Sequence, residues 1–297
     1  MPKNPFAVLA VIAKQDGKLR EAETAYRRAL PLLEQPDHHR ATVLGNLANL
    51  LTIRGEFDDA ERHYQRMLTI SESETYTLGR AIGHIGLGDI AQARGHLTDA
   101  EESYKKAVKL LERLEGEVRR IAVISALGMN AARRGDFQTA ETRLRKALAL
   151  AREKEASGLE GVVLNGLGEM YRMRGNLAEA EKFHRSAEGI FRQEKKDRGG
   201  KAGVLAGLGK VALERDQFVE SAELLRRALR ICDEIGIEND TAAKFELWRG
   251  EALAGQGKTA SACTAFVRAR NLYRRAGNDG KIRTVERFMA EANCPGS

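Results

Sequence analysis

The sequence predicts an all-α protein in which pairs of helices are repeated and stacked as a solenoid. In residues 161–191, apolar and small residues recur at helical spacing on both sides of a turn at residues 174–176. The same two-helix unit returns along nearly all of the 297 residues. A chain in which each unit packs on its neighbours forms one continuous body, whatever its length.

Each unit is defined by four positions around its turn. The turn residues are Gly17, Gly55, Gly95, Gly135, Gly175, Asp216 and Gly257, spaced 38 to 41 residues apart. Seven residues earlier stands a small residue: Ala10, Ala48, Gly88, Gly128, Gly168, Gly209 and Gly250. Five residues after the turn come Ala22, Ala60, Ala100, Ala140, Ala180, Ser221 and Ala262, and nine after it Tyr26, Tyr64, Tyr104, Leu144, His184, Leu225 and Phe266. A glycine within a helix costs about 0.5–1 kcal/mol relative to alanine, so its recurrence indicates close helix packing.

These residues resemble the tetratricopeptide repeat, in the longer form of about 40 residues that kinesin light chains, Pins-type adaptors and bacterial regulators contain. The small residue of the first helix, the turn glycine, an Ala-Glu pair such as Ala100-Glu101 and the later aromatic residue all match. The resemblance implies a right-handed superhelix of seven helix-turn-helix repeats in a single domain over residues 1–297. The expected repeats are residues 4–35, 38–73, 76–114, 117–156, 159–196, 200–236 and 240–276, and a capping helix follows at residues 279–293.

Composition favours a protein of the cytoplasm. The 49 basic and 42 acidic residues give a net charge of +7, spread over a long surface. The three cysteines, Cys232, Cys263 and Cys294, are odd in number and far apart in sequence, which argues against disulfides and for a reducing compartment. No apolar run is long enough to span a membrane, and the run at residues 6–13 fits the first repeat helix better than a signal peptide.

No motif supports catalysis, so we expect no enzymatic activity, no cofactor and no metal. Residues 252–259 match a loose phosphate-loop pattern, but they fall across a turn between two helices, where the required strand is missing. The six histidines show no metal-ligand spacing. His184 occupies the large packing position of its repeat and is expected in the core.

We therefore expect a scaffold or adaptor that binds a peptide or helix of a protein partner. In the family that the chain resembles, the first helix of each repeat lines a concave face. The positions that correspond to this face carry a charge-balanced, amphipathic set: Asn49, Ile85, Asp89, Gln92, Met129, Arg133, Asn165, Glu169, Arg172 and Lys210. Small residues two positions before the small position, such as Gly86 and Gly207, either pack on the preceding repeat or lower the floor of the groove.

Three other functions remain open. The chain could be a regulatory domain of a larger signalling or transcription-regulating protein, or it could self-assemble through its open ends. Recurrent basic residues of the second helices could bind nucleic acid. This is the less favoured reading, because glutamates four residues earlier pair with most of them: Glu23 with Arg27, Glu101 with Lys105, Glu141 with Arg145, Glu181 with Arg185, and Glu223 with Arg227.

Overall fold

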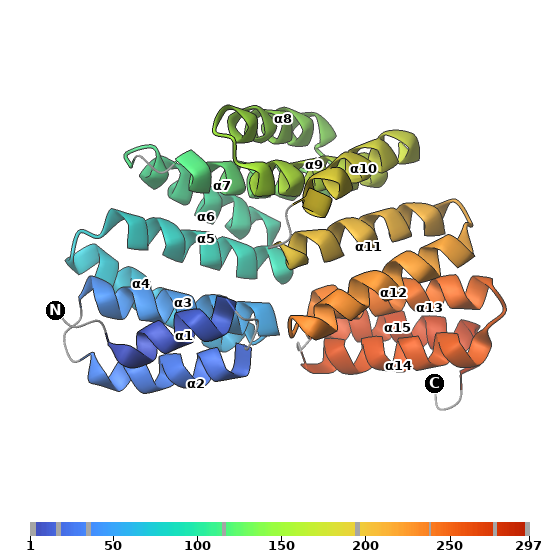
Figure 1. Cartoon of the computed structure of the whole chain (residues 1–297), viewed down its shortest axis with the longest axis horizontal. Coiled ribbons are helices and arrows are strands. Elements are labelled where there is room, and N and C mark those ends of the chain that lie inside the picture. The colour runs from blue at the N-terminus through green and yellow to red at the C-terminus, as the bar shows by residue number, and fades with distance from the viewer. Residues whose placement is uncertain are drawn as a thin grey trace. The chain divides into compact units, whose positions relative to one another are not determined.

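The computed structural model describes residues 4–15, 19–33, 37–114, 117–193, 197–237, 239–275 and 278–294. These residues form fifteen α-helices and one short 3-10 helix, and no strand occurs among them (Figure 1). The predicted all-α class is confirmed. The turn residue Gly17 and the expected repeat boundaries at residues 35, 196 and 276 lie outside the described residues.

The chain divides into two compact units, Met1–Ala156 and Ser157–Ser297. The first contains α1 (Pro5–Gln15), α2 (Leu19–Ala29), η1 (Leu30–Leu32), α3 (His38–Arg54), α4 (Phe57–Ser73), α5 (Thr77–Ala93), α6 (Leu97–Leu111), α7 (Glu117–Arg133) and α8 (Phe137–Glu153). The second contains α9 (Ser157–Met173), α10 (Leu177–Gln193), α11 (Arg198–Glu214), α12 (Phe218–Glu234), α13 (Asp240–Gly255), α14 (Thr259–Arg275) and α15 (Asp279–Glu291). The sequence predicts one continuous solenoid. That prediction concerns how the two units join, and it stays a prediction.

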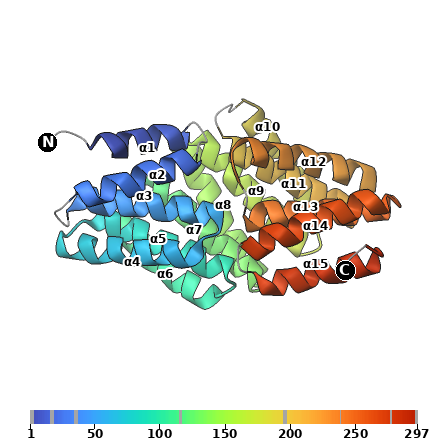
Figure 2. The ribbon, with the colours of Figure 1, turned by 90° about the horizontal axis from the view of Figure 1, so that it is seen from below.

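Within each unit, consecutive helices pack as hairpins, and each hairpin packs on the next (Figures 1 and 2). Odd-numbered helices also contact one another: α3 with α5, α9 with α11, and α11 with α13. The hairpin turns require a left-handed residue, which glycine adopts without steric cost. Gly95, Gly135 and Gly175 have φ of 83°, 83° and 85°. Asp216 takes the same region with φ 59°, a conformation that Asp tolerates better than most side chains.

The large side chain nine residues after each turn fills a slot between two small residues. His184 contacts Gly168 in its own hairpin, where an added Cβ would lie 2.7 Å from the imidazole, and Gly207 in the next, where it would lie 2.4 Å away. Tyr64 contacts Gly86 of the following hairpin in the same way. The small residues at these positions therefore serve packing against the preceding hairpin. His184 is fully buried, as expected.

Ion pairs join neighbouring hairpins in a recurring pattern. An arginine directly before a turn reaches back to a glutamate in the preceding hairpin, in the pairs Arg54–Glu23, Arg94–Glu61, Arg134–Glu101 and Arg215–Glu181. In the next copy of the pattern both charges are absent. Ala222 replaces the glutamate, and Gln256 replaces the arginine and donates to the carbonyl of Phe218 at 2.8 Å.

Most of the expected pairs along a helix are present: Arg27–Glu23 at 2.8 Å, Lys105–Glu101 at 3.1 Å, Arg145–Glu141 at 2.9 Å and Arg185–Glu181 at 3.6 Å. The prediction for Glu223 holds only in part, because the charge of Arg227 helps to lower the pKa of Glu223 without forming a hydrogen bond to it. Its carboxylate bonds to Arg226 at 2.7 Å and not to Arg227. The i,i+3 arginine reaches both carboxylate oxygens of Glu223.

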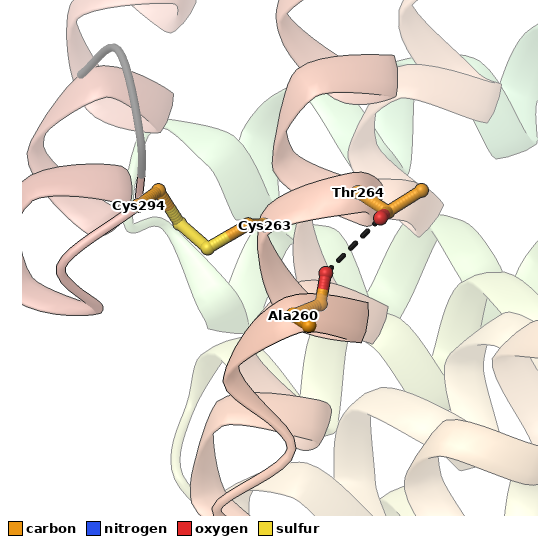
Figure 3. Close-up of a disulfide and its surroundings, with 4 residues drawn as sticks. All are labelled: Ala260, Cys263, Thr264 and Cys294. Atoms are coloured by element: carbon orange, nitrogen blue, oxygen red, sulfur yellow. Dashed lines mark hydrogen bonds between the residues drawn. A yellow bond between two sulfur atoms is a disulfide. The ribbon is translucent and has the colours of Figure 1, made fainter.

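The expectation of unpaired cysteines was wrong, because Cys263 of α14 forms a disulfide with Cys294, which follows α15 (Figure 3). The two residues are 31 apart in sequence, so spacing alone gave no sign that the fold brings them together. Cys232 is free and buried. The sequence argument for a reducing compartment loses its basis.

The last helix, α15, packs on α14. Asn278 caps it by accepting the N–H of Lys281 at 3.2 Å. Val285 and Met289 are fully buried, and the ring of Phe288 stacks on Phe266 with 6.0 Å between centroids. A turn closes this helix too, since Asn293 has φ 54°.

Candidate partner-binding face

In the second unit, the exposed sides of α9, α11 and α13 carry a chain of alternating charges. Arg172 of α9 forms a bidentate pair with Glu169, at 2.8 and 2.9 Å, and reaches Glu214 of α11 at 2.5 Å. Lys210 of α11 lies 3.8 Å from Glu214 and 3.8 Å from Glu251 of α13. This network therefore joins three helices. It brings the predicted residues Glu169, Arg172 and Lys210 into contact with Glu214 and Glu251.

Burial and neighbouring charges both shift the pKa values of Glu169 and Glu251 in this network. Burial alone would raise the pKa of Glu169, but the hydrogen bonds and charge of Arg172 outweigh it and hold that pKa below its ordinary value. Burial raises the pKa of Glu251, and Glu214 adds to the effect while Lys210 opposes it. Glu251 therefore takes up a proton at a higher pH than an ordinary glutamate.

Trp248 lies at one end of this face, beside two ammonium groups. The Nζ atoms of Lys210 and Lys244 are 5.4 and 5.0 Å from its indole centroid, which is cation–π distance. The indole is half-buried and also stacks on Phe245 at 6.0 Å. The arrangement offers an aromatic surface with positive charge at its edges.

Asn165 occupies the opposite end, on α9. Its Oδ1 accepts the Nδ1–H of buried His184 at 2.9 Å, which fixes the orientation of the amide. Burial lowers the pKa of His184 to about 4, so the imidazole is neutral at pH 7. The Asn165 amide nitrogen lies toward α11, where an added Cβ on Gly203 would be 3.6 Å away. Among the described residues no acceptor binds this nitrogen, so the group is a pre-oriented donor on the face.

In the first unit, predicted residues of α3 and α5 contact buried tyrosines. Asp89 of α5 accepts the hydroxyl hydrogen of Tyr104 at 2.7 Å. Burial raises the pKa of Asp89 to about 6, although the Tyr104 hydrogen bond and the charge of Arg133 on α7 act in the opposite direction. Asn49 of α3 interacts with the hydroxyl of Tyr64.

The other predicted residues of this unit lie on the same helices. Ile85 packs partly against the α5–α7 core, and Met129 is half-buried on α7. The Nε2 atom of Gln92 is buried and has no hydrogen-bond partner among the described atoms. These contacts place the ten predicted residues in two sets, one in each unit.

Glu214 and Glu251 are not among the ten predicted residues. Their contacts with Arg172 and Lys210 depend on the approach of α9, α11 and α13, which the sequence pattern alone does not measure. The phosphate-loop match at residues 252–259 is the end of α13, a turn and the start of α14. Within the described part of the chain, no group of three or more His, Cys, Asp or Glu side chains is placed to hold a metal ion. No described helix has both the length and the apolarity to cross a bilayer.

Comparison with known families gives a match to the tetratricopeptide-repeat profile over residues 6–73, 79–153 and 159–234. No curated protein sequence matches the chain.

Solved structures match in fold at low sequence identity. A Rap protein in complex with competence and sporulation factor is 14% identical, has a TM-score of 0.59, and the match covers 98% of this chain and 100% of that one. The anaphase-promoting-complex assembly Cut9–Hcn1 gives 15% identity and a TM-score of 0.65, over 95% of this chain and 48% of that one. A tetratricopeptide repeat protein from Parabacteroides merdae is 16% identical with a TM-score of 0.54, and the match covers 96% of this chain and 97% of that one.

Proposed function

The chain belongs to the tetratricopeptide-repeat family, and we propose that it is a non-enzymatic scaffold whose odd-numbered helices bind an extended or helical segment of a partner protein. The observation that carries this proposal is the face of α9, α11 and α13. It combines an aromatic surface, a pre-oriented amide and a charge-balanced network on side chains that packing and ion pairs already hold in place.

Pre-organisation is the physical reason to favour binding at this face. Ordering a long side chain at an interface costs about 0.5–1.5 kcal/mol, and Arg172 and Lys210 are already restrained. The Asn165 amide can donate to a peptide carbonyl, and Trp248 can anchor an apolar side chain. Two proteins of similar fold support a binding function. The Rap structure contains competence and sporulation factor, and Cut9 is assembled with Hcn1.

The ion pairs also determine which substitutions can test binding at this face without disturbing the fold. Reversing the charge of Arg172 would bring three carboxylates together and disturb the fold as well as the face. Trp248→Ala with Lys244→Glu changes the face at one end of the network. Lys182→Glu on α10 is the matched control, because its side chain is 69% exposed and its one ion pair among the described residues, to Glu179 at 3.6 Å, lies along its own helix.

The experiment selects a random-peptide phage library against the immobilised full chain and measures the enriched peptides by calorimetry. We expect the W248A/K244E variant to bind at least about tenfold more weakly, the range of one lost hot-spot side chain. The K182E control should bind like the wild type, and circular dichroism should show equal helicity for all three. Failure to enrich any peptide, or equal losses in the variant and the control, would contradict binding at this face.

A further inference from the structure

The basic residues of the second helices come in pairs whose two members have different surroundings. In α12, Arg226 is bonded to Glu223 through both of its contacting nitrogens, at 2.7 and 2.8 Å. Arg227, the next residue, is half-buried and lines a pocket instead. In α12 the glutamate therefore bonds to the first member of the pair and interacts with the second only through its charge.

This pocket has a volume of about 300 Å³ and lies between the end of α10, the start of α11 and α12. Its walls include Phe191, Leu205 and Ile231. Five basic residues line it: Arg192, Arg198, Lys201, Arg227 and Arg230. Two acidic residues, Asp197 and Glu234, line it too, so the charged lining carries a net +3.

The acidic residues are committed to other partners. Glu234 pairs with Arg198 and lies 4.0 Å from Arg230. Asp197 accepts the N–H of Gly200 at 2.7 Å and caps α11. Among the described residues, neither Lys201 nor Arg227 forms a hydrogen-bonded ion pair, although the charge of Arg227 helps to lower the pKa of Glu223 on the same helix. The side chains of these two cations are therefore not held in place by a carboxylate.

The same pair recurs in the first unit, in a pocket of about 280 Å³ between α6, α7 and α8. There Arg120 stands fifteen residues before the turn residue Gly135, and Lys146 eleven after it. Lys201 and Arg227 have the same offsets from the turn residue Asp216. In the α9–α10 hairpin both cations are replaced, by Glu160 and Ser186.

Both cations occur in the α6–α8 and α10–α12 pockets and both are replaced in the α9–α10 hairpin, whereas the α13–α14 hairpin has Ala242 and Arg268 at these offsets. Arg143 and Glu112 also line the α6–α8 pocket, but Arg143 is bonded to Glu101. This pocket therefore has fewer uncommitted charges than the α10–α12 pocket, and should bind the same chemical group more weakly.

We infer that the α10–α12 pocket is an anion site that binds a phosphoryl group carried on an organic molecule or side chain. A net charge of +3 favours a dianion over a single carboxylate, and guanidinium and ammonium donors are suited to phosphate oxygens. The volume exceeds that of the bare anion, and the apolar wall can contact the carbon atoms next to the phosphoryl group. This site uses none of the residues of the proposed partner-binding face.

The test is calorimetry on the full chain at ~150 mM NaCl, where a weakly basic surface loses most of its affinity for polyanions. The probes are inorganic phosphate, O-phosphoserine and a phosphoserine peptide, with the unphosphorylated peptide as reference. The Lys201→Gln/Arg227→Gln variant removes both charges, and Arg226→Gln is the control, one residue away and outside the pocket. Circular dichroism checks that both variants keep their helicity.

We expect phosphate-bearing probes to bind the wild type and the R226Q control alike, and the double variant about a hundredfold more weakly, the loss of two charge-assisted hydrogen bonds. Binding of the phosphoserine probes should also weaken below about pH 6, where the phosphomonoester dianion takes up a proton and becomes a monoanion. Tighter binding of the phosphopeptide than of O-phosphoserine identifies a modified protein as the source, and the reverse order identifies a free metabolite. Equal binding of the unphosphorylated peptide, or no difference between K201Q/R227Q and R226Q, would overturn the inference.

Discussion

Cys263 lies six residues after its turn residue, where Glu101 stands in an earlier hairpin, and it bonds covalently to Cys294. In four other hairpins a glutamate at this position forms an ion pair with an arginine of the next hairpin. The disulfide therefore replaces that ion pair at the contact between α14 and the segment that ends α15.

Reducing this bond should destabilise the second unit. Closing a loop of this length in the unfolded chain is worth about 2–4 kcal/mol. We expect dithiothreitol to lower the urea midpoint of the wild type and to leave a Cys263→Ser/Cys294→Ser variant unchanged. Thiol titration in denaturant should find the single free Cys232 in the oxidised protein. Three reactive thiols in protein prepared without reductant would show that the bond does not form.

Removal of α15 tests whether this helix is a cap. Deleting residues 278–297 in a Cys263→Ser background uncovers Phe266 and the surfaces that Val285 and Met289 bury. Each of these two side chains is worth about 1.5–3 kcal/mol, so the melting temperature should fall clearly below that of full-length C263S/C294S. Light scattering should show association through the exposed surface. A truncated chain that stays monomeric and equally stable would instead point to α15 as a docking site.

Two glycine-to-alanine changes in the second unit should shift the free energy of unfolding in opposite directions. In Gly207→Ala the new Cβ would lie 2.4 Å from the His184 ring, so the substitution should cost about 1–3 kcal/mol through overpacking. In Gly189→Ala the Cβ would meet no atom within 4 Å, and the helix should gain about 0.5–1 kcal/mol. Urea denaturation of both variants measures the difference. Equal effects would contradict the slot between Gly168 and Gly207.

The burial of His184 should make the second unit sensitive to acid. Its pKa is about 4 in the folded protein, whereas an unfolded histidine titrates near 6.5. The unfolded state therefore binds more protons between these values, and stability should fall as the pH falls from about 6.5 to 4, by at most about 3 kcal/mol. His184→Leu, which copies Leu144 and Leu225, should fold and lose this part of the pH dependence. Identical pH profiles for the variant and the wild type would refute the assignment.

Overpacking tests the repeat register itself. Ala100 and Ala140 are fully buried where two helices meet, each five residues after its turn glycine. Replacing either with leucine should cost about 1–3 kcal/mol in thermal unfolding, because the interior cannot take the added volume without strain. No loss of stability in either variant would count against the register.

Much of the fold could be predicted because its determinants are local. Helical spacing, the glycine at each turn and the small residue seven positions before it all lie within one hairpin, and α5, α6, α9 and α10 begin and end close to where these signals place them. The position of His184 in the core followed from the same register. The candidate face could be listed by register too, as Asn165 and Arg172 on α9 illustrate, since side chains on one side of a helix follow from its period.

What the sequence determined by itself is thus the class of the fold and the side of each helix that its residues occupy. Only the tertiary structure decided that Cys263 meets Cys294 and that Arg172 of α9 reaches Glu214 of α11. The reason is distance. A helix period fixes the direction of a side chain, whereas a disulfide, a bridge between helices or a pocket requires atoms from separate segments to approach within a few ångströms, which depends on how the hairpins pack.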